Sequence, residues 1–197
     1  MTDTLDPQFW DELYRRRQQL FSGRPNGALV DEAAALAPGR ALDLGCGEGA
    51  DARWLAERGW QVTAVDLAEV ALQRAAAADH PAITWQRADL LSTPPPAASF
   101  ALVSAQYFPI PRQLGPDPVR GLIEAVAPGG TLLVTAHDPA DVPDGHDFDP
   151  HAFVQPAEIA ELLEESWTVL VHERRERSAP TPDTPHVHDL VLRAQRA

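Results

Sequence analysis

Apolar and polar positions alternate along the middle of the chain in a way that predicts strands and helices in turn. Short runs rich in β-branched, aliphatic and aromatic residues, bounded by Gly, Pro or Asp, are typical of buried strands. Five such runs occupy residues 40–44, 60–67, 83–90, 100–108 and 131–137. Apolar residues at helical spacing predict helices between some of these runs, at 50–59, at 68–78 and at 119–126.

Two helices are predicted before the first strand. Residues 6–21 place apolar side chains at helical spacing, with Asp6 as the N-cap and Pro7 at the first helical position. A turn at 23–27 separates this segment from a second apolar pattern at 27–36. The chain therefore starts with a helical segment that precedes the sheet.

The C-terminal part of the chain follows a different pattern. A helix is predicted over 156–166, and two strands are predicted over 167–176 and 186–195, with only a Pro-rich and Thr-rich stretch between them. A parallel pair needs a long crossover connection, usually a helix, so these two strands are expected to form an antiparallel hairpin.

These elements define an α/β fold class. Helical crossovers between successive strands favour parallel pairing, so the first five strands predict a doubly wound, mostly parallel, Rossmann-like sheet. The chain has 197 residues, of which 44% are hydrophobic, which suits one compact core. We therefore predict a single domain over 1–197, with no internal repeat.

Charge and cysteine content restrict the possible partners. The formal net charge is −13, so a phosphate-rich partner such as nucleic acid would be repelled by the mean field. Cys46 is the only cysteine, which rules out an internal disulfide framework. Without a signal-peptide pattern or a membrane-spanning apolar run, a soluble, cytoplasmic protein that binds a small molecule is expected. The oligomeric state stays open.

The stretch "DLGCGEG" after the first strand carries the strongest chemical signal. Gly45, Gly47 and Gly49 occupy alternate positions just before a helix, where backbone amides face a ligand without interference from Cβ atoms. Asp66 ends the second strand, 19 residues beyond Gly47. An acid at this spacing can accept hydrogen bonds from both ribose hydroxyls, which predicts a nucleoside-containing ligand.

Two cofactor classes satisfy the glycine pattern, namely a nicotinamide dinucleotide and S-adenosylmethionine. The acid at Asp43, the sequence "RADL" at 87–90, the sequence "APGGTLLV" at 127–134 and the terminal hairpin favour the second. Together these features resemble the class I S-adenosylmethionine-dependent methyltransferases. The resemblance covers residues 9–196, and the short N-terminal helices look closest to the tellurite-resistance and thiopurine methyltransferase branch.

The resemblance implies a strand order of 3-2-1-4-5-7-6 with strand seven antiparallel, and S-adenosylmethionine as cofactor. It places the glycine loop around methionine and ribose, Asp66 on the ribose diol, and Asp89 at the adenine amine. The residues implied to bind the cofactor are Tyr14, Arg24, Asp43, Gly45, Cys46, Gly47, Glu48, Gly49, Asp66, Leu67, Ala88, Asp89, Leu90 and Ala105. Asp51, by contrast, is expected to be a helix cap.

In that branch the N-terminal segment closes over the cofactor, so 1–36 is predicted to be a helical lid. Trp10, Tyr14 and the turn at 22–26 are the candidates for direct contact. Arg24 is positioned to pair with the methionine carboxylate or with an acidic substrate, or is an exposed turn residue. Asn26 is expected to supply turn geometry.

The acceptor site is expected over the ends of the fourth and fifth strands. Tyr107 and His137 are weak candidates for deprotonating or orienting an acceptor, with pocket wall and strand-end hydrogen bonding as the alternatives. The histidines and aspartates at 137–151 match no zinc spacing, so no metal is expected.

The predicted function is methyl transfer to a sulfur, oxygen, nitrogen or metalloid nucleophile of a small molecule. Such an acceptor needs little acid–base catalysis when it is already nucleophilic, because alignment in a dry pocket then supplies most of the effect. The alternatives are an NAD(P)-dependent oxidoreductase and a non-catalytic S-adenosylmethionine-binding regulator.

Overall fold

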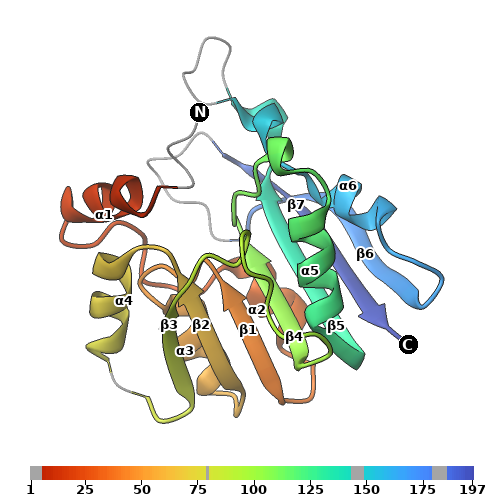
Figure 1. The fold of residues 1–197 in the computed structure, drawn as a ribbon, viewed down its shortest axis with the longest axis horizontal. Coiled ribbons are helices and arrows are strands. Elements are labelled where there is room, and N and C mark those ends of the chain that lie inside the picture. The colour runs from red at the N-terminus through yellow and green to blue at the C-terminus, as the bar shows by residue number, and fades with distance from the viewer. Residues whose placement is uncertain (1–5, 79, 143–148, 179–185) are drawn as a thin grey trace.

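A computed structural model describes residues 6–78, 80–142, 149–178 and 186–197. Its centre is one seven-stranded sheet in the order β3-β2-β1-β4-β5-β7-β6 (Figure 1). The strands are β1 (Arg40–Leu44), β2 (Gln61–Asp66), β3 (Ile83–Arg87), β4 (Phe100–Gln106), β5 (Val126–His137), β6 (Trp167–Glu176) and β7 (His188–Arg196). The helices are α1 (Pro7–Arg15), α2 (Gly27–Ala33), α3 (Ala50–Ala56), α4 (Glu69–Ala76), α5 (Asp117–Ala125) and α6 (Pro156–Glu161).

The pairing confirms the predicted topology. Strands β1 to β5 run parallel, and β7 is antiparallel to both β5 and β6. The connection from β3 to β4, residues 88–99, contains no helix. Pro94, Pro95 and Pro96 explain this, because proline lacks an amide donor and disfavours helical geometry in the residue before it.

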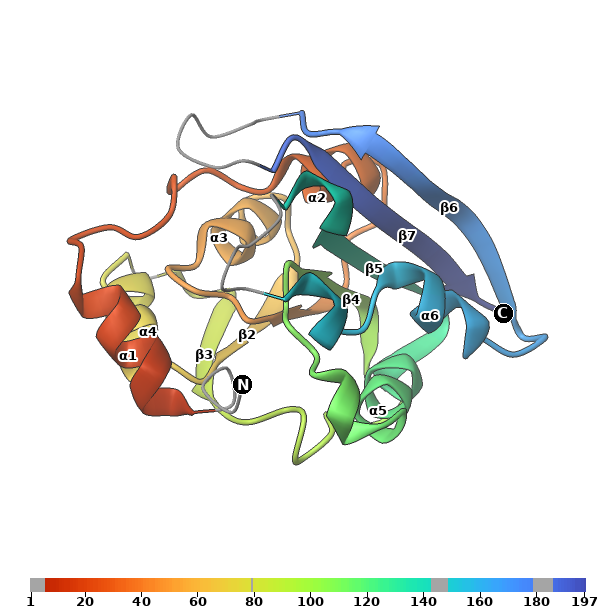
Figure 2. The same ribbon diagram turned by 90° about the horizontal axis from the view of Figure 1, so that it is seen from above.

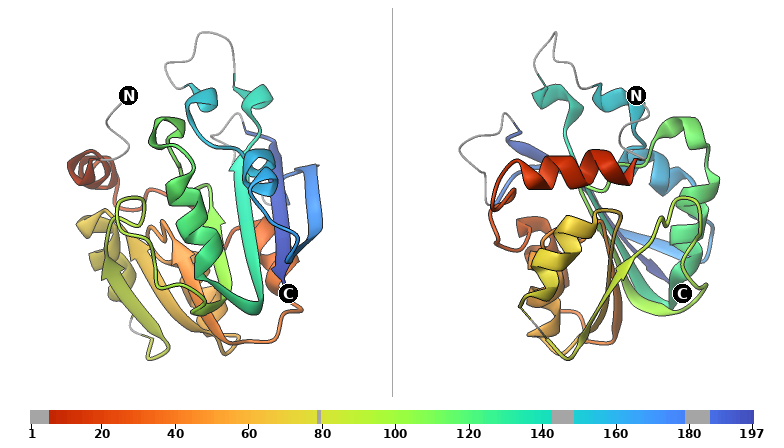
Figure 3. Two further views of the ribbon diagram at one scale, coloured as in Figure 1. Left: turned by 45° about the vertical axis from the view of Figure 1, so that its right-hand side comes forward. Right: turned by 60° about the vertical axis from the view of Figure 1, so that its left-hand side comes forward.

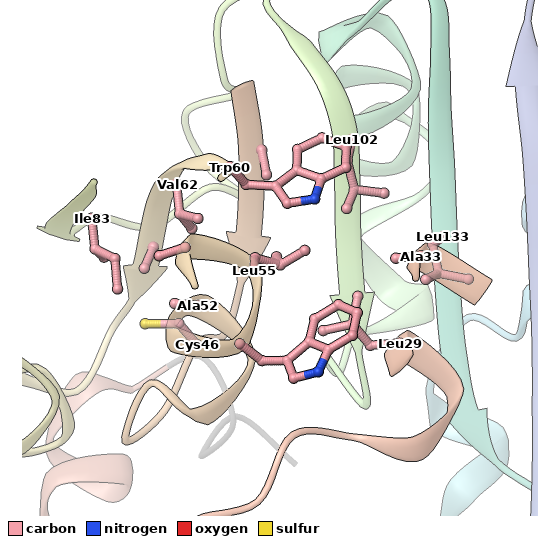
Figure 4. Close-up of a cluster of buried hydrophobic side chains, with 14 of the residues drawn as sticks. Leu29, Ala33, Cys46, Ala52, Leu55, Trp60, Val62, Ile83, Leu102 and Leu133 are labelled. Atoms are coloured by element: carbon pink, nitrogen blue, oxygen red, sulfur yellow. The ribbon is translucent and has the colours of Figure 1, made fainter. Parts of the chain in front are cut away.

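Helices cover both faces of the sheet. Figure 2 shows α2 and α3 on one side and α5 and α6 on the other. Side chains alternate accordingly along β1, where Ala41 joins the first hydrophobic cluster and Leu42 joins the second. The first cluster is drawn in Figure 4, which labels Leu29, Ala33, Cys46, Ala52, Leu55, Trp60, Val62, Ile83, Leu102 and Leu133.

Several element boundaries differ from the predictions. β5 starts at Val126, where it pairs with Phe100, and not at Thr131. The "PGG" sequence is therefore inside an irregular strand, with Gly129 at φ +74° and a register shift in the pairing with β4. The N-terminal helix α1 begins at Pro7, with the Asp6 side chain accepting from the Gln8 amide as predicted, but it ends at Arg15.

The N-terminal helix α1 lies over α4 at one end of the sheet (Figure 3). Asp11 accepts a hydrogen bond of 2.9 Å from the Val70 amide, and Tyr14 packs with Ala68 and Ala71. Contacts of this kind hold the N-terminal segment close to the carboxyl ends of the parallel strands.

Within the described ranges, none of the helices combines the length and the apolar character that crossing a lipid bilayer requires. The predicted single domain and the predicted lid role of 1–36 stay predictions.

Candidate functional site

A cavity of about 590 Å³ opens beyond the carboxyl ends of the parallel strands. In open α/β sheets the ligand crevice lies at this end, where the strand order reverses. Here the reversal falls between β1 and β4. The walls come from the N-terminal segment, the glycine loop after β1 and the ends of β2, β3, β4, β5 and β6.

The glycine loop between β1 and α3 has the backbone conformation that the sequence predicts. Gly45, Gly47 and Gly49 have φ values of +64°, +53° and +81°, and all three line the cavity. The protein itself also excludes side chains here. A Cβ atom on Gly49 would lie 2.4 Å from the Trp85 ring, and one on Gly47 would lie 2.9 Å from the Tyr14 hydroxyl.

Asp66 ties the glycine loop to the end of β2. One carboxylate oxygen accepts from the Gly47 amide at 2.8 Å, and the other accepts from the Ala68 amide at 2.8 Å. A carboxylate has about four acceptor positions, so each oxygen retains one for a ligand. Asp66 therefore orients the loop and also presents acceptors to the cavity it lines.

Asp43 is the most deeply buried acid of the site. It is 2% exposed, and within the described part of the chain its Oδ2 atom has no hydrogen-bond partner. Burial, followed by the negative charges of Asp51 and Asp66, raises the pKa of Asp43 well above its usual range. A buried carboxylate without a partner is costly, so the site favours a donor or a cation beside Asp43.

Burial also raises the pKa of Asp51 and of Asp66, the other two acids in this part of the cavity. The Cys46 thiol is buried as well, and burial together with the charge of Asp43 raises its pKa. A raised pKa disfavours the thiolate, so Cys46 is unsuited to act as a nucleophile. It lines the cavity as a small residue of the loop.

The prediction that Asp51 caps a helix is wrong. It is the second residue of α3, and its two oxygens accept from the Asn26 backbone amide and side-chain amide, each at 2.7 Å. Gly49 is at the N-cap position instead, without a side-chain cap. Asn26 is therefore more than a turn residue, because it joins the N-terminal segment to α3.

Glu48 forms a second link to the N-terminal segment. Its carboxylate accepts from the backbone amides of Leu20 and Phe21 at 3.1 and 3.3 Å, and pairs with Arg74 at 2.9 Å. Arg74 also donates to the Tyr14 carbonyl oxygen at 2.9 Å. Two acids of the "GEGAD" sequence thus hold residues 20–26 over the cavity.

The far wall of the cavity is formed by aromatic and basic side chains. Tyr107 directly follows β4 and lies in the left-handed region, at φ +54°, and its hydroxyl donates to Asp189 at 2.9 Å. Its ring stacks on His137 with centroids 4.3 Å apart, and the Arg177 guanidinium lies 5.0 Å from its centroid. A non-glycine residue at positive φ often marks a functional position.

His137 is poorly suited to remove a proton at neutral pH. Burial, followed by the charges of His186 and Arg177, lowers the pKa of His137 to about 3. A general base works best when its pKa lies near the operating pH, so the neutral ring serves as an aromatic wall that supports Tyr107.

The cavity brings together most of the residues that the sequence singled out. Its lining includes Tyr14, Arg24, Asp43, Gly45, Cys46, Gly47, Glu48, Gly49, Asp66, Leu67, Ala88, Asp89, Leu90, Tyr107 and His137. Ala105 is not in the lining and is buried in the second hydrophobic cluster. Gln106, Phe108 and Pro109 line the cavity after it, and Arg177 was missed because no local motif marks it.

One acidic cluster outside the cavity has the residue types of a metal site. Ligand atoms of Asp138, Asp141 and His188 lie within 4.8 Å of one another. The Arg174 guanidinium pairs with Asp138 and lies 4.0 Å from Asp141, so a cation already offsets one of the two carboxylate charges of the cluster. His146 and Asp147, considered from the sequence, are outside the described residues.

Comparisons with known proteins agree with this fold. Residues 41–130 match a protein family described as "Methyltransferase domain". The chain is 33% identical over 137 residues to the 2-heptyl-1-hydroxyquinolin-4(1H)-one methyltransferase of Mycobacteroides abscessus, covering 66% of this chain and 60% of that protein. It is 32% identical over 162 residues to the trans-aconitate 2-methyltransferase of Sinorhizobium fredii, covering 81% of this chain and 58% of that protein. The chain thus spans about three fifths of these curated relatives.

Solved structures share the fold at lower identity. One, from work on the conversion of a disulfide bond into a thioacetal group during echinomycin biosynthesis, has a TM-score of 0.75 at 23% identity and covers 96% of this chain and 91% of its own. TehB from Haemophilus influenzae has a TM-score of 0.69 at 19% identity, and the match covers 95% of this chain and 66% of the TehB chain. TehB gives the predicted branch a loose match at the level of the fold.

The sheet order is the one that the sequence resemblance implied, and residues 41–130 match the methyltransferase domain family. These findings confirm the predicted resemblance to the class I S-adenosylmethionine-dependent methyltransferases.

Proposed function

We propose that this chain transfers the methyl group of S-adenosylmethionine to a small-molecule acceptor. The observation that carries the proposal is the unpartnered Oδ2 atom of buried Asp43 beside a glycine loop whose residues line the cavity. S-adenosylmethionine carries an ammonium group and a sulfonium cation. Both suit a cavity whose lining includes the carboxylates of Asp43, Asp51 and Asp66.

The described residues fit the cofactor. Asp43 would accept from the ammonium group of the cofactor. Gly45, Gly47 and Gly49 have no Cβ atoms, so the cofactor can lie directly against the backbone of the loop. Asp66 would accept from the ribose hydroxyls with the acceptor positions that Gly47 and Ala68 leave free. These assignments follow from burial, hydrogen-bond capacity and position in the cavity.

The adenine end is assigned to the carboxyl end of β3. Leu67, Ala88 and Leu90 supply apolar wall for a ring, while Asp89 lies at the same edge. Asp89 already accepts from the Leu91 and Ser92 amides, at 3.0 and 3.2 Å. These bonds fix its carboxylate, and a fixed carboxylate is a suitable acceptor for an exocyclic amine.

The chain's contribution to catalysis is alignment and exclusion of water. The bound cofactor would supply an electrophilic methyl group. Leu20 and Phe21, held by Glu48, cover the cavity from the N-terminal side, and Tyr107 and Phe108 close it from β4. A dry cavity that orients both reactants accelerates transfer to an acceptor that is already nucleophilic.

The curated relatives support a small-molecule acceptor. The names of two of them specify a hydroxyquinolone and trans-aconitate, and that of a third specifies malonyl-[acyl-carrier protein]. Acceptor tests should therefore include hydroxyquinolones and small carboxylic acids, along with thiols, phenols and metalloid oxyanions.

S-adenosylhomocysteine is expected to raise the thermal midpoint of the protein. A ligand present at 100 times its Kd stabilises the native state by about 2.7 kcal/mol. For a chain of this length that corresponds to a rise of about 5–10 °C. NADH and NADPH at the same concentration should produce a much smaller rise. A larger shift with either dinucleotide would favour the oxidoreductase alternative.

The lid hypothesis predicts a local change in hydrogen exchange. The amides of Leu20, Phe21 and Asn26 donate to carboxylates of the loop and α3, so closure of the segment should protect them. With S-adenosylhomocysteine at 100 times its Kd, their exchange should slow by up to about a hundredfold.

The His151 amide provides an internal control for that measurement. It donates to Asp149 outside residues 1–36 and outside the lining of the main cavity. Its exchange should change much less than that of Leu20 or Asn26. Tight ligand binding without added protection at 20–26 would mean that the segment packs on the sheet and does not act as a lid.

A further inference from the structure

A small polar pocket of about 40 Å³ adjoins the main cavity on the side of Tyr107. Its charged and hydroxyl-bearing lining residues are Ser22, Arg24, Tyr107, Arg177, Ser178 and Asp189. Arg24, Tyr107 and Arg177 also line the main cavity, so a molecule in the cavity can extend one group into the pocket. The volume is small enough to select a compact polar group.

Arg177 is held in a fixed orientation at the junction. Its Nε atom lies 3.4 Å from Asp189, its guanidinium stacks over the Tyr107 ring, and its backbone amide donates to the Val187 carbonyl oxygen at 2.9 Å. The side chain is 12% exposed. Since its position is set by the protein, little side-chain entropy would be lost when it binds a ligand.

The pocket carries an excess of one positive charge. Arg24 forms no ion pair with any residue that the structure describes, whereas Arg177 is balanced by Asp189. This excess is unusual beside a cavity lined by Asp43, Asp51 and Asp66, in a chain of net charge −13. The two ends of the joined cavities therefore favour ligands of opposite charge.

We propose that this side pocket binds a carboxylate group of the methyl acceptor, so that the acceptor is a small carboxylic acid. The inference rests on the proposed methyltransferase function, which it extends by naming the substrate class. Arg177 offers a planar set of donors that suits a carboxylate, Arg24 supplies the excess charge, and the Ser22 and Ser178 hydroxyls add further donors.

A carboxylate fits this pocket better than a phosphate does. One excess positive charge matches a monoanion, while a phosphate monoester carries nearly two charges at neutral pH and would face Asp189. The carboxylate would orient the acceptor by one end and leave the rest of the molecule in the main cavity. Arg24 is then a residue of the acceptor site, which is one of the three alternatives that the sequence left open for it.

Calorimetric titration of the S-adenosylhomocysteine complex with trans-aconitate and with glutarate tests the proposal. Both acids should bind, and their methyl esters should bind at least about tenfold more weakly. Arg177→Gln should weaken binding of the acids at least about tenfold, because it removes a charge-assisted pair. Arg24→Gln should weaken it in the same direction without changing the affinity for S-adenosylhomocysteine.

Arg16→Gln is the matched control. Arg16 is exposed and lines neither the main cavity nor the side pocket, so its loss alters the net charge equally and should leave carboxylate affinity within about twofold. Asp189→Asn should act in the opposite direction and strengthen carboxylate binding, because it removes the anion that competes for Arg177.

Four outcomes would overturn the proposal. These are equal affinity for acids and esters, equal loss in the Arg16 and Arg177 variants, tighter binding of glycerol 3-phosphate than of either acid, and binding of S-adenosylhomocysteine with no response to the acids. The last outcome would leave the proposed function standing. If S-adenosylhomocysteine itself fails to bind, the proposed function fails, and the same acid titrations on the free protein decide the pocket separately.

Discussion

Gly49→Ala is expected to lower the free energy of unfolding by about 2–5 kcal/mol. Gly49 has φ +81°, a conformation that costs a residue with a Cβ roughly 1–2 kcal/mol. The new methyl group would lie 2.4 Å from the Trp85 ring and 3.1 Å from the Ala75 Cβ atom. Overpacking of a core typically costs a further 1–3 kcal/mol, and urea denaturation would measure the total.

Gly129→Ala separates the two contributions. Gly129 has φ +74°, close to that of Gly49, but a Cβ atom there would meet no atom within 4 Å. Its substitution should therefore cost only the conformational component, about 1–2 kcal/mol. If the two variants lose equal stability, the packing of Trp85 against the loop is not what requires glycine at position 49.

Most of the fold could be predicted because local patterns agree with the global topology. The bounds of β1 and β6 match the predicted strands 40–44 and 167–176. The hairpin was predicted because the sequence has no helical pattern between the predicted strands 167–176 and 186–195, and the parallel sheet was predicted from helical patterns between most other strands. Topology of this kind depends on the order of the elements and tolerates errors at their ends.

The boundaries that differ depend on tertiary pairing. Pro128, Gly129 and Gly130 carry turn signals, yet β5 continues through them because Val126 pairs with Phe100. Residues 88–99 interrupt the alternation of strands and helices, because three consecutive prolines exclude a helix there. Local propensity gives way to packing in the first case and decides the outcome in the second.

The cavity residues next to β1 and β2 could be predicted from the sequence, whereas those next to β4 and β6 could be predicted only in part. Asp43, Gly47 and Asp66 belong to a local pattern of fixed spacing. The partners of Glu48 and Asp51 lie 25 to 28 residues upstream in a segment without regular structure, so sequence spacing could not reveal them. Arg177 comes from the end of β6 and meets Tyr107 only because β7 lies beside β5.

Asp66→Ala is expected to reduce affinity for S-adenosylmethionine at least about tenfold. If the carboxylate accepts both ribose hydroxyls, each charge-assisted bond contributes about 1.5–3 kcal/mol, and about 1.4 kcal/mol corresponds to a factor of ten. The substitution also frees the Gly47 and Ala68 amides, so the loop loses the two bonds that fix its shape. Calorimetric titration measures the affinity directly.

Asp149→Ala is the matched control for removing an aspartate that accepts a backbone amide. Asp149 accepts from the His151 amide at 2.9 Å and does not line the main cavity. Cofactor affinity should stay within about twofold in this variant. A large loss there would show that the assay reports general destabilisation.

Asp66→Asn separates the ligand contact from the loop contact. Asparagine keeps the size of the side chain and one oxygen, so it can still accept from either the Gly47 or the Ala68 amide, while its NH₂ group cannot accept from a hydroxyl. Its melting temperature should stay closer to that of the parent than the melting temperature of Asp66→Ala does, because burial raises the pKa of Asp66 and a neutral side chain costs less to bury. Affinity for the cofactor should nevertheless fall about tenfold, since the charged acceptor is lost. If both variants bind S-adenosylmethionine as tightly as the parent, the ribose does not lie at Asp66, and the assignment of the whole cavity has to change.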